Sequence, residues 1–116
     1  MTPRENVLLL GLVDWVPLER IHASVAQANP DAPLAVVQTR TLDLIRSLAN
    51  ERLIDIGDLA GRDARFTPWE SPLDASIDRL RKVYVAEFDA NTWPWFCWIN
   101  LTQEGDQLAR RIEAGC

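Results

Sequence analysis

Two stretches of this chain decide its fold: Thr41–Leu59 (TLDLIRSLANERLIDIGDL) and Trp95–Ile112 (WFCWINLTQEGDQLARRI). The first begins with apolar residues at helical spacing and then alternates apolar and polar residues over 53–59, so it predicts a helix that runs into a strand. The second predicts a strand over 95–101, followed by a helix that Thr102 caps.

Helix-start signals divide the chain before these stretches. Thr2–Glu5 (TPRE) combines a capping residue, a proline at the first helical position and a carboxylate where a capping box requires one. The helix that begins there is apolar nearly all round, so we expect it to be buried. Pro17 begins a second helix that ends at Asn29–Asp31, because a residue before proline avoids the helical region. A third helix begins between positions 33 and 37 and ends near Glu51.

A fourth helix is predicted inside the connection between the two strands. Ser71–Asp74 (SPLD) is a helix-start signature, with Ser71 as the cap. One apolar stripe at helical spacing follows, formed by Leu73, Ile77, Leu80 and Tyr84. A stripe of this kind has to be buried against the rest of the chain or against a second copy.

Composition and charge limit the classes of function. The chain has 116 residues, the size of one domain, and its 17 acidic and 12 basic residues give a net charge of −5. This balance repels nucleic acid and anionic membranes as a whole, although a local basic face can still bind phosphate. The apolar run over 7–13 is too short to span a membrane. Cys97 lies in an aromatic run and Cys116 is the last residue, so we expect no disulfide and a reducing, cytoplasmic location.

In this order the elements resemble a winged helix-turn-helix domain. Leu48-x-x-x-x-Leu53-Ile54 is similar to the junction of recognition helix and wing, and Leu101-Thr102-x-x-Gly105-x-x-Leu108 is similar to the exit from the wing. The resemblance implies one α+β, mainly α domain over 1–116, with a helix inserted in the wing. It also implies a two-stranded antiparallel sheet in which strand 53–59 pairs with strand 95–101. It also implies that these four leucines are buried together. Arg52 stands where that family usually has glycine.

Most winged-helix proteins bind DNA, so the resemblance implies a DNA-binding transcriptional regulator. Gln38, Arg40 and Arg46 would then face the major groove, and Arg62 and Arg65 would lie near the backbone. Over 38–65, however, five basic residues are balanced by five acidic ones. A bound duplex demands a positive face near its phosphates, so this balance favours a second function.

That second function is an acidic protein-interaction module of the accessory or inhibitor type. Four tryptophans fall in or beside the long wing: Trp69, Trp93, Trp95 and Trp98. If the strand alternates from position 95, Trp95 points to one side and Trp98 to the other. Either the inserted helix covers these rings as a second small core, or Tyr84, Trp93 and Trp95 form an interface for a homodimer or a protein partner.

The residues with catalytic side chains have simpler interpretations. His22, the only histidine, lies on the apolar side of the second helix and is interpreted as a packed core residue. Cys97 is interpreted as buried, and the acidic residues at 55, 58 and 63 as a solvated strand edge and turn. No nucleotide-binding, hydrolase or zinc-protease motif is present. We therefore predict no enzyme activity, no metal and no cofactor.

Overall fold

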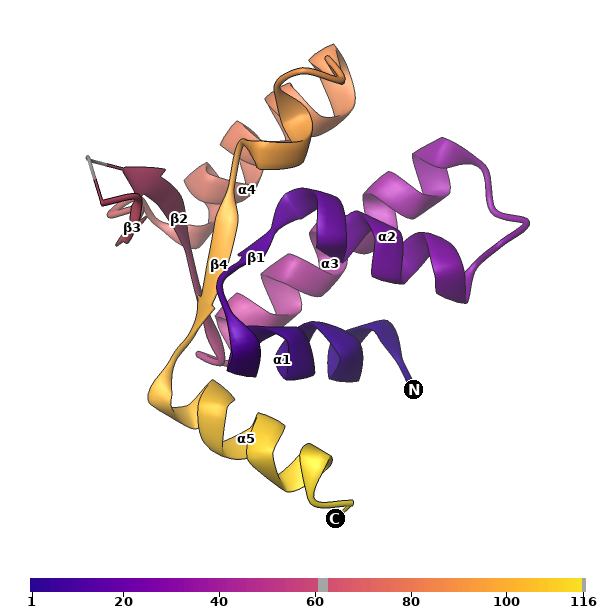
Figure 1. Ribbon diagram of the computed structural model, residues 1–116. Coiled ribbons are helices and arrows are strands. Elements are labelled where there is room, and N and C mark those ends of the chain that lie inside the picture. The colour runs from indigo at the N-terminus through magenta and orange to yellow at the C-terminus, as the bar shows by residue number, and fades with distance from the viewer. Residues whose placement is uncertain (61–62, 116) are drawn as a thin grey trace.

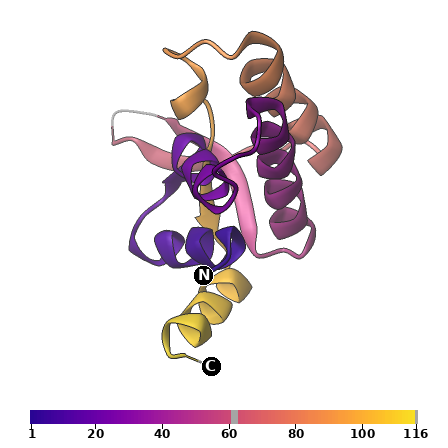
Figure 2. The same cartoon turned by 90° about the vertical axis from the view of Figure 1, so that its right-hand side faces the viewer.

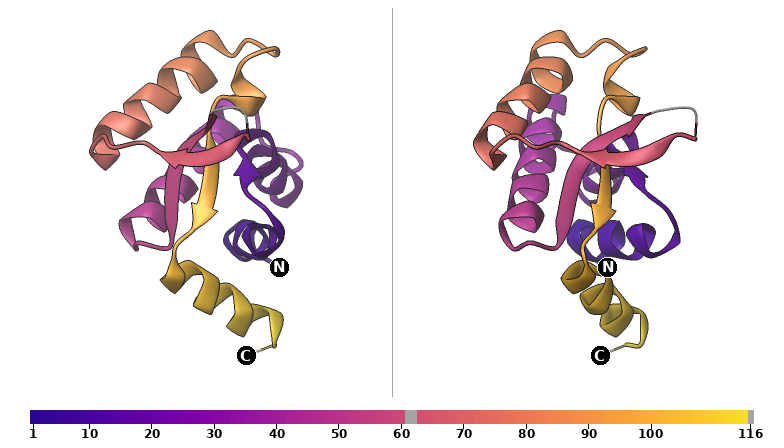
Figure 3. Two further views of the ribbon diagram at one scale, coloured as in Figure 1. Left: turned by 60° about the vertical axis from the view of Figure 1, so that its left-hand side comes forward. Right: turned by 90° about the vertical axis from the view of Figure 1, so that its left-hand side faces the viewer.

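The computed structural model describes residues 1–60 and 63–115 and shows an α+β, mainly helical chain (Figure 1). In chain order the described elements are α1 (Pro3–Val13), β1 (Val16–Pro17), α2 (Leu18–Ala28), α3 (Leu34–Asn50), β2 (Ile54–Ala60), β3 (Arg65–Pro68), α4 (Leu73–Arg81), the π-helical turn η1 (Lys82–Glu87), the 3₁₀ turn η2 (Trp93–Trp95), β4 (Trp98–Leu101) and α5 (Gln103–Glu113). Helices α1, α2 and α3 lie on one face of the sheet (Figures 2 and 3).

Helix α1 starts as its sequence predicts. The Thr2 hydroxyl accepts a hydrogen bond from the Glu5 N–H at 3.1 Å, and the Glu5 carboxylate accepts one from the Thr2 N–H at 3.0 Å. The expectation that α1 is buried holds for the middle of the helix and not for its end. Val7 and Leu8 are fully buried, whereas Val13 is 86% exposed. Helix α1 packs on α2, α5 and β4, and residues 3–6 and 9–12 are half-buried.

The predicted antiparallel pairing of β2 with β4 is confirmed. Ile54 lies opposite Leu101, and Ile56 lies opposite Ile99. The prediction of a two-stranded sheet is wrong, because β1 and β3 extend it to the four-stranded order β1-β4-β2-β3 among the described residues. Both added strands are too short for an alternating pattern: β1 has two residues and β3 has four.

Strand β4 begins later than the sequence predicts. Residues Trp93–Trp95 form a 3₁₀ turn, and the ladder starts only at Trp98. Pro94 has no N–H for a sheet ladder, which favours a turn at this point. The expected alternation from position 95 is therefore wrong, and Trp95 and Trp98 stack on each other with ring centroids 5.8 Å apart.

The two sequence stretches meet at one joint. The Thr102 N–H donates to the Leu53 carbonyl at 3.0 Å, and its hydroxyl donates to the Arg52 carbonyl at 2.6 Å. Gly105 packs against the same turn, because a Cβ there would lie 2.0 Å from the Leu53 oxygen. Leu48 and Leu53 are buried as predicted. Leu101 and Leu108 are half-buried and pack against the same core.

The stripe on the inserted helix is buried within the chain. Ile77, Leu80 and Tyr84 have no exposed surface, and Leu73 packs beside them against the common core. Helix α4 lies alongside α3 and continues into the π-helical turn η1. Phe88 caps η1 with a left-handed φ of 42°. The inserted helix is thus part of the main core, not a separate one.

We expect Leu48→Ala to lower the free energy of unfolding by about 2–5 kcal/mol, because it leaves a cavity where α3 meets the sheet. Leu34→Ala is the matched control, since Leu34 is 47% exposed on the same helix. Urea denaturation measures the free energy of unfolding of both variants. Equal effects of the two substitutions would contradict this account of the core.

We expect Arg52→Gly to raise the free energy of unfolding by about 1 kcal/mol, because a residue with a side chain is strained in the left-handed region. Arg52 has a φ of 61° between α3 and β2. Arg52→Ala is the control, since it removes the exposed side chain and retains the strain. The expectation fails if alanine stabilises the fold as much as glycine does in thermal denaturation.

Candidate functional site

Gln38 was expected in a DNA groove, but it lies inside the protein. Its side chain is 5% exposed, and its amide donates a hydrogen bond to the Tyr84 main-chain carbonyl at 3.0 Å. The expectation that it faces outward is wrong, because η1 packs against this part of α3. Gln38 therefore joins the inserted segment to the main body.

Of the arginines expected at DNA, the three that the structure describes each have a polar partner. Arg40 donates to the Asn29 side chain, and Arg46 forms an ion pair with Asp74 at 2.5 Å. Asp74 belongs to the first turn of α4, so the inserted helix brings its own carboxylate to the exposed side of α3. The Arg65 Nε lies 3.9 Å from the Asp63 Oδ2. Arg62 lies outside the described residues.

A polar depression separates α3 from the start of α4. Its charged groups are one guanidinium, from Arg46, and two carboxylates, from Asp43 and Asp74. The other lining residues are Ser47, Asn50, Pro72 and Leu73. The local charge is therefore −1. Phosphate binding requires the opposite sign.

Two of the three residues expected at a protein interface are buried in an aromatic cluster. Tyr84 is 0% and Trp93 is 9% exposed, so the expectation that they form an exposed interface is wrong. The Trp93 ring lies 5.0 Å from Phe88, 5.2 Å from Tyr84 and 5.0 Å from His22, measured between centroids. These rings are needed to fill the space between α2 and η1.

His22 is tied into this cluster. Its Nδ1 lies 2.5 Å from the Tyr84 hydroxyl, a hydrogen-bond distance. Burial lowers the pKa of His22, and the negative charge of Glu19 opposes this in part. Burial also raises the pKa of Tyr84 to about 12. Both groups are therefore neutral at neutral pH, and the interpretation of His22 as a packed residue fits this geometry.

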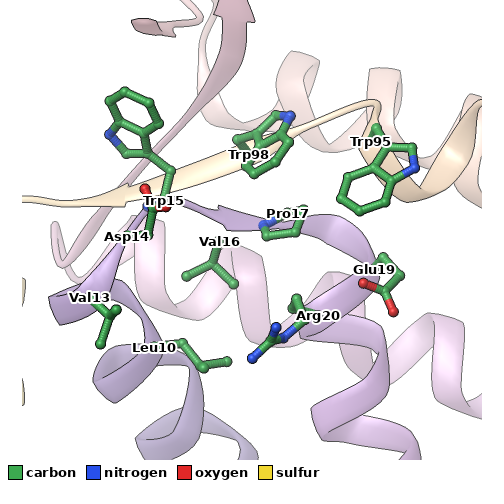
Figure 4. A pocket seen from close by; sticks show the side chains of 10 residues that line it. All are labelled: Leu10, Val13, Asp14, Trp15, Val16, Pro17, Glu19, Arg20, Trp95 and Trp98. Atoms are coloured by element: carbon green, nitrogen blue, oxygen red, sulfur yellow. The ribbon is translucent and has the colours of Figure 1, made fainter. Parts of the chain in front are cut away.

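Trp95 is the expected interface residue that stays outside. Its side chain is 57% exposed, and it borders a groove of about 300 Å³ (Figure 4). The groove lies where the end of α1, strand β1 and the first turn of α2 meet β4. We call it the tryptophan groove; its lining residues are Leu10, Val13, Asp14, Trp15, Val16, Pro17, Glu19, Arg20, Trp95 and Trp98.

Three tryptophans follow strand β4 along this groove. Figure 4 shows Trp15, Trp98 and Trp95 in that order, with Pro17 next to Trp98. Pro17 is the partner of Trp98 in the β1–β4 pairing, and Trp15 stacks on Phe66 of β3 at 6.4 Å between centroids. From the sequence, Pro17 was expected only to begin the second helix, and no strand was expected before it. The missed signal was a tryptophan, a valine and a proline directly after an apolar helix.

The open edge of the groove has few main-chain donors. The Trp15 N–H already donates to the Asp14 carboxylate at 2.8 Å, and Pro17 has no N–H. Two carboxylates and one guanidinium line the groove, from Asp14, Glu19 and Arg20. The tryptophan groove is therefore apolar in its body and slightly acidic in its charge.

The other reactive side chains are arranged as structural residues. Cys97 is completely buried, and burial raises the pKa of its thiol. Such a thiol is a poor nucleophile, because the thiolate is the reactive form. Cys116 lies outside the described residues. Across 1–60 and 63–115, no cluster of three metal-binding side chains occurs, which includes the acidic residues near the β2–β3 turn.

Comparison with known proteins identifies no relative of this chain: no protein-family model, no curated protein and no solved structure matches it. None of the helices in the described segments has the length and apolar character needed to cross a bilayer. Function must therefore be inferred from the tryptophan groove and from the distribution of charge.

We expect the stability that His22 provides to be greatest above about pH 6.5, its usual pKa. Between that pH and the lower pKa in the folded state, the unfolded chain binds a proton that the folded chain does not, so stability is lost as the pH falls. His22→Gln retains polar groups and does not titrate. The stability of the wild type relative to this variant should be greater near pH 7.5 than near pH 5; a constant difference would contradict the prediction.

Proposed function

We propose that this protein is an interaction module that binds a protein partner through the tryptophan groove. The observation that carries the proposal is Trp95, which is 57% exposed and stacked on Trp98 beside an apolar groove. Exposed tryptophans are favoured anchors in protein interfaces because a large apolar ring is removed from water on binding. Tyr84 and Trp93 already fill the aromatic cluster, so Trp95 is not needed to complete the core.

We also propose that the fold is a winged helix-turn-helix with α4 inserted in the wing. Three features support it. Strand β2 follows α3 directly and pairs with β4. Arg52 has a positive φ at the position where the winged-helix resemblance leads one to expect glycine. Thr102 caps α5 through its hydroxyl, which accepts from the Gly105 N–H at 3.1 Å, as suits the wing-exit pattern.

DNA binding is the second candidate, and it is supported by this resemblance alone. The charges around α3 favour a protein partner instead. Arg46 is paired with Asp74, Gln38 is occupied by the Tyr84 carbonyl, and the adjacent depression has a local charge of −1. The whole chain, at −5, adds a repulsive term toward any polyanion.

We expect Trp95→Ala to abolish partner binding and to change the free energy of unfolding by less than about 1 kcal/mol, since the ring is largely exposed. The assay is affinity capture with the wild type and the variant, followed by titration of the purified partner. Val85→Ala is the matched control, because Val85 is an exposed apolar residue on η1, at 39%. Sedimentation of the wild type and of Trp95→Ala tests whether the partner is a second copy.

A parallel titration with random duplex DNA at low ionic strength tests the alternative. We expect no binding, because the chain and the surface beside α3 are negatively charged. The assay is decisive, since even non-specific DNA-binding proteins associate with DNA under these conditions. Binding that falls steeply with salt and is weakened by Arg40→Ala and Arg46→Ala would overturn the proposal in favour of a DNA-binding regulator. Partner capture that is unchanged in Trp95→Ala would overturn the assignment of the groove.

A further inference from the structure

We propose that the tryptophan groove takes a proline-rich, basic segment of the partner protein, bound as an extended polyproline II helix. This inference rests on the proposed function and names the chemistry of the partner. Three properties of the groove carry it: its blocked strand edge, its aromatic and proline walls, and the sign of its charge.

The strand edge argues against a partner that adds a β-strand. Strand addition needs a row of main-chain N–H and C=O groups on the exposed edge. At β1 the Trp15 N–H is held by Asp14, and Pro17 has no N–H. Edge prolines of this kind prevent further pairing. A polyproline II segment has no such requirement, because it is recognised by its ring surfaces and by its solvated carbonyls.

The walls of the groove fit proline rings. Trp95 and Trp98 stack at 5.8 Å with 30° between their planes, and Pro17 lies opposite Trp98 across the β1–β4 pair. Val16 is buried beneath them, and Val13 is 86% exposed at the end of α1. Aromatic-lined grooves recognise proline-rich segments by packing against these rings, and the indole N–H groups supply donors for ligand carbonyls.

The charge of the groove fits basic flanking residues. Figure 4 shows Asp14 close to Trp15 at one end, and Glu19 on the side of Trp95 at the other. Arg20 is the single cation among the lining residues, so the groove has a charge of −1 on a chain of −5. An arginine or lysine next to the prolines would meet a carboxylate at either end. An acidic flank would be repelled by both.

The test measures binding of four fluorescein-labelled synthetic peptides by fluorescence anisotropy. RPPPRPPPR has both features, SPPPSPPPS has prolines without charge, EPPPEPPPE reverses the charge, and RSGSRSGSR has the charge without prolines. We expect RPPPRPPPR to bind most tightly, with an affinity about tenfold or more higher than that of EPPPEPPPE or RSGSRSGSR. SPPPSPPPS should fall between these limits.

Three variants locate the binding. Trp95→Ala should lower the affinity for RPPPRPPPR about tenfold or more, because it removes an interface anchor. Glu19→Gln should weaken RPPPRPPPR and leave SPPPSPPPS unchanged, whereas Val85→Ala should change neither. Thermal denaturation of each variant verifies that it is folded.

The proposal is overturned if RPPPRPPPR binds no better than RSGSRSGSR, or if Trp95→Ala leaves its affinity unchanged. If the peptides fail but a captured partner still depends on Trp95, the interaction module stands and the proline-rich class is wrong. If sedimentation shows a dimer that Trp95→Ala dissociates, the groove takes a second copy of this chain, which also overturns the proline-rich class. Failure of both peptides and partner capture removes the two proposals together.

Discussion

The close approach of Gly105 to the Leu53 carbonyl is the constraint on which the rest of the fold depends. A side chain at 105 would collide with that oxygen at 2.0 Å, so glycine lets the first turn of α5 sit directly on the turn after α3. Thr102 then bonds to both Arg52 and Leu53 while it caps α5. Four elements are joined within a few residues: α3, β2, β4 and α5. This joint fixes the register of β2 against β4. Strand β1 then pairs with the free edge of β4, and β3 pairs with the free edge of β2.

The inserted segment determines which aromatic rings stay outside. Helix α4 and η1 lie along α3 and bring Tyr84 to His22, and Trp93 and Phe88 close the cluster. Trp95, two residues after Trp93, lies outside this cluster, on the side of the sheet where β1 is the edge strand. Pro94 separates the two environments with a single 3₁₀ turn. The short segment 93–95 therefore places Trp93 in the core and Trp95 on the surface.

The main elements could be predicted from the sequence because their signals are local, whereas the meeting of the two stretches at the joint was expected only from the winged-helix resemblance. The capping box at Thr2, the stripe that ends at Tyr84 and the pattern after Leu101 each depend on neighbouring residues alone. The groove could not be predicted in this way. It needs Trp15 and Pro17 next to Trp98, and a two-residue strand has no periodicity to reveal that pairing. The interior position of Gln38 was missed for the same reason, since its partner is 46 residues away.

The inserted helix also changes what α3 can bind. In a helix that reads DNA, exposed arginines have to meet phosphates, which needs a surplus of positive charge. Here the first turn of α4 places Asp74 on Arg46, and Asp43 lies on the same depression. A polyanion would have to displace the Asp74 carboxylate and would still meet a negative surface. The tryptophan groove has no comparable barrier, because an exposed indole loses only water when a partner covers it. The proposed binding surface therefore lies at β1 and β4, away from the exposed face of α3.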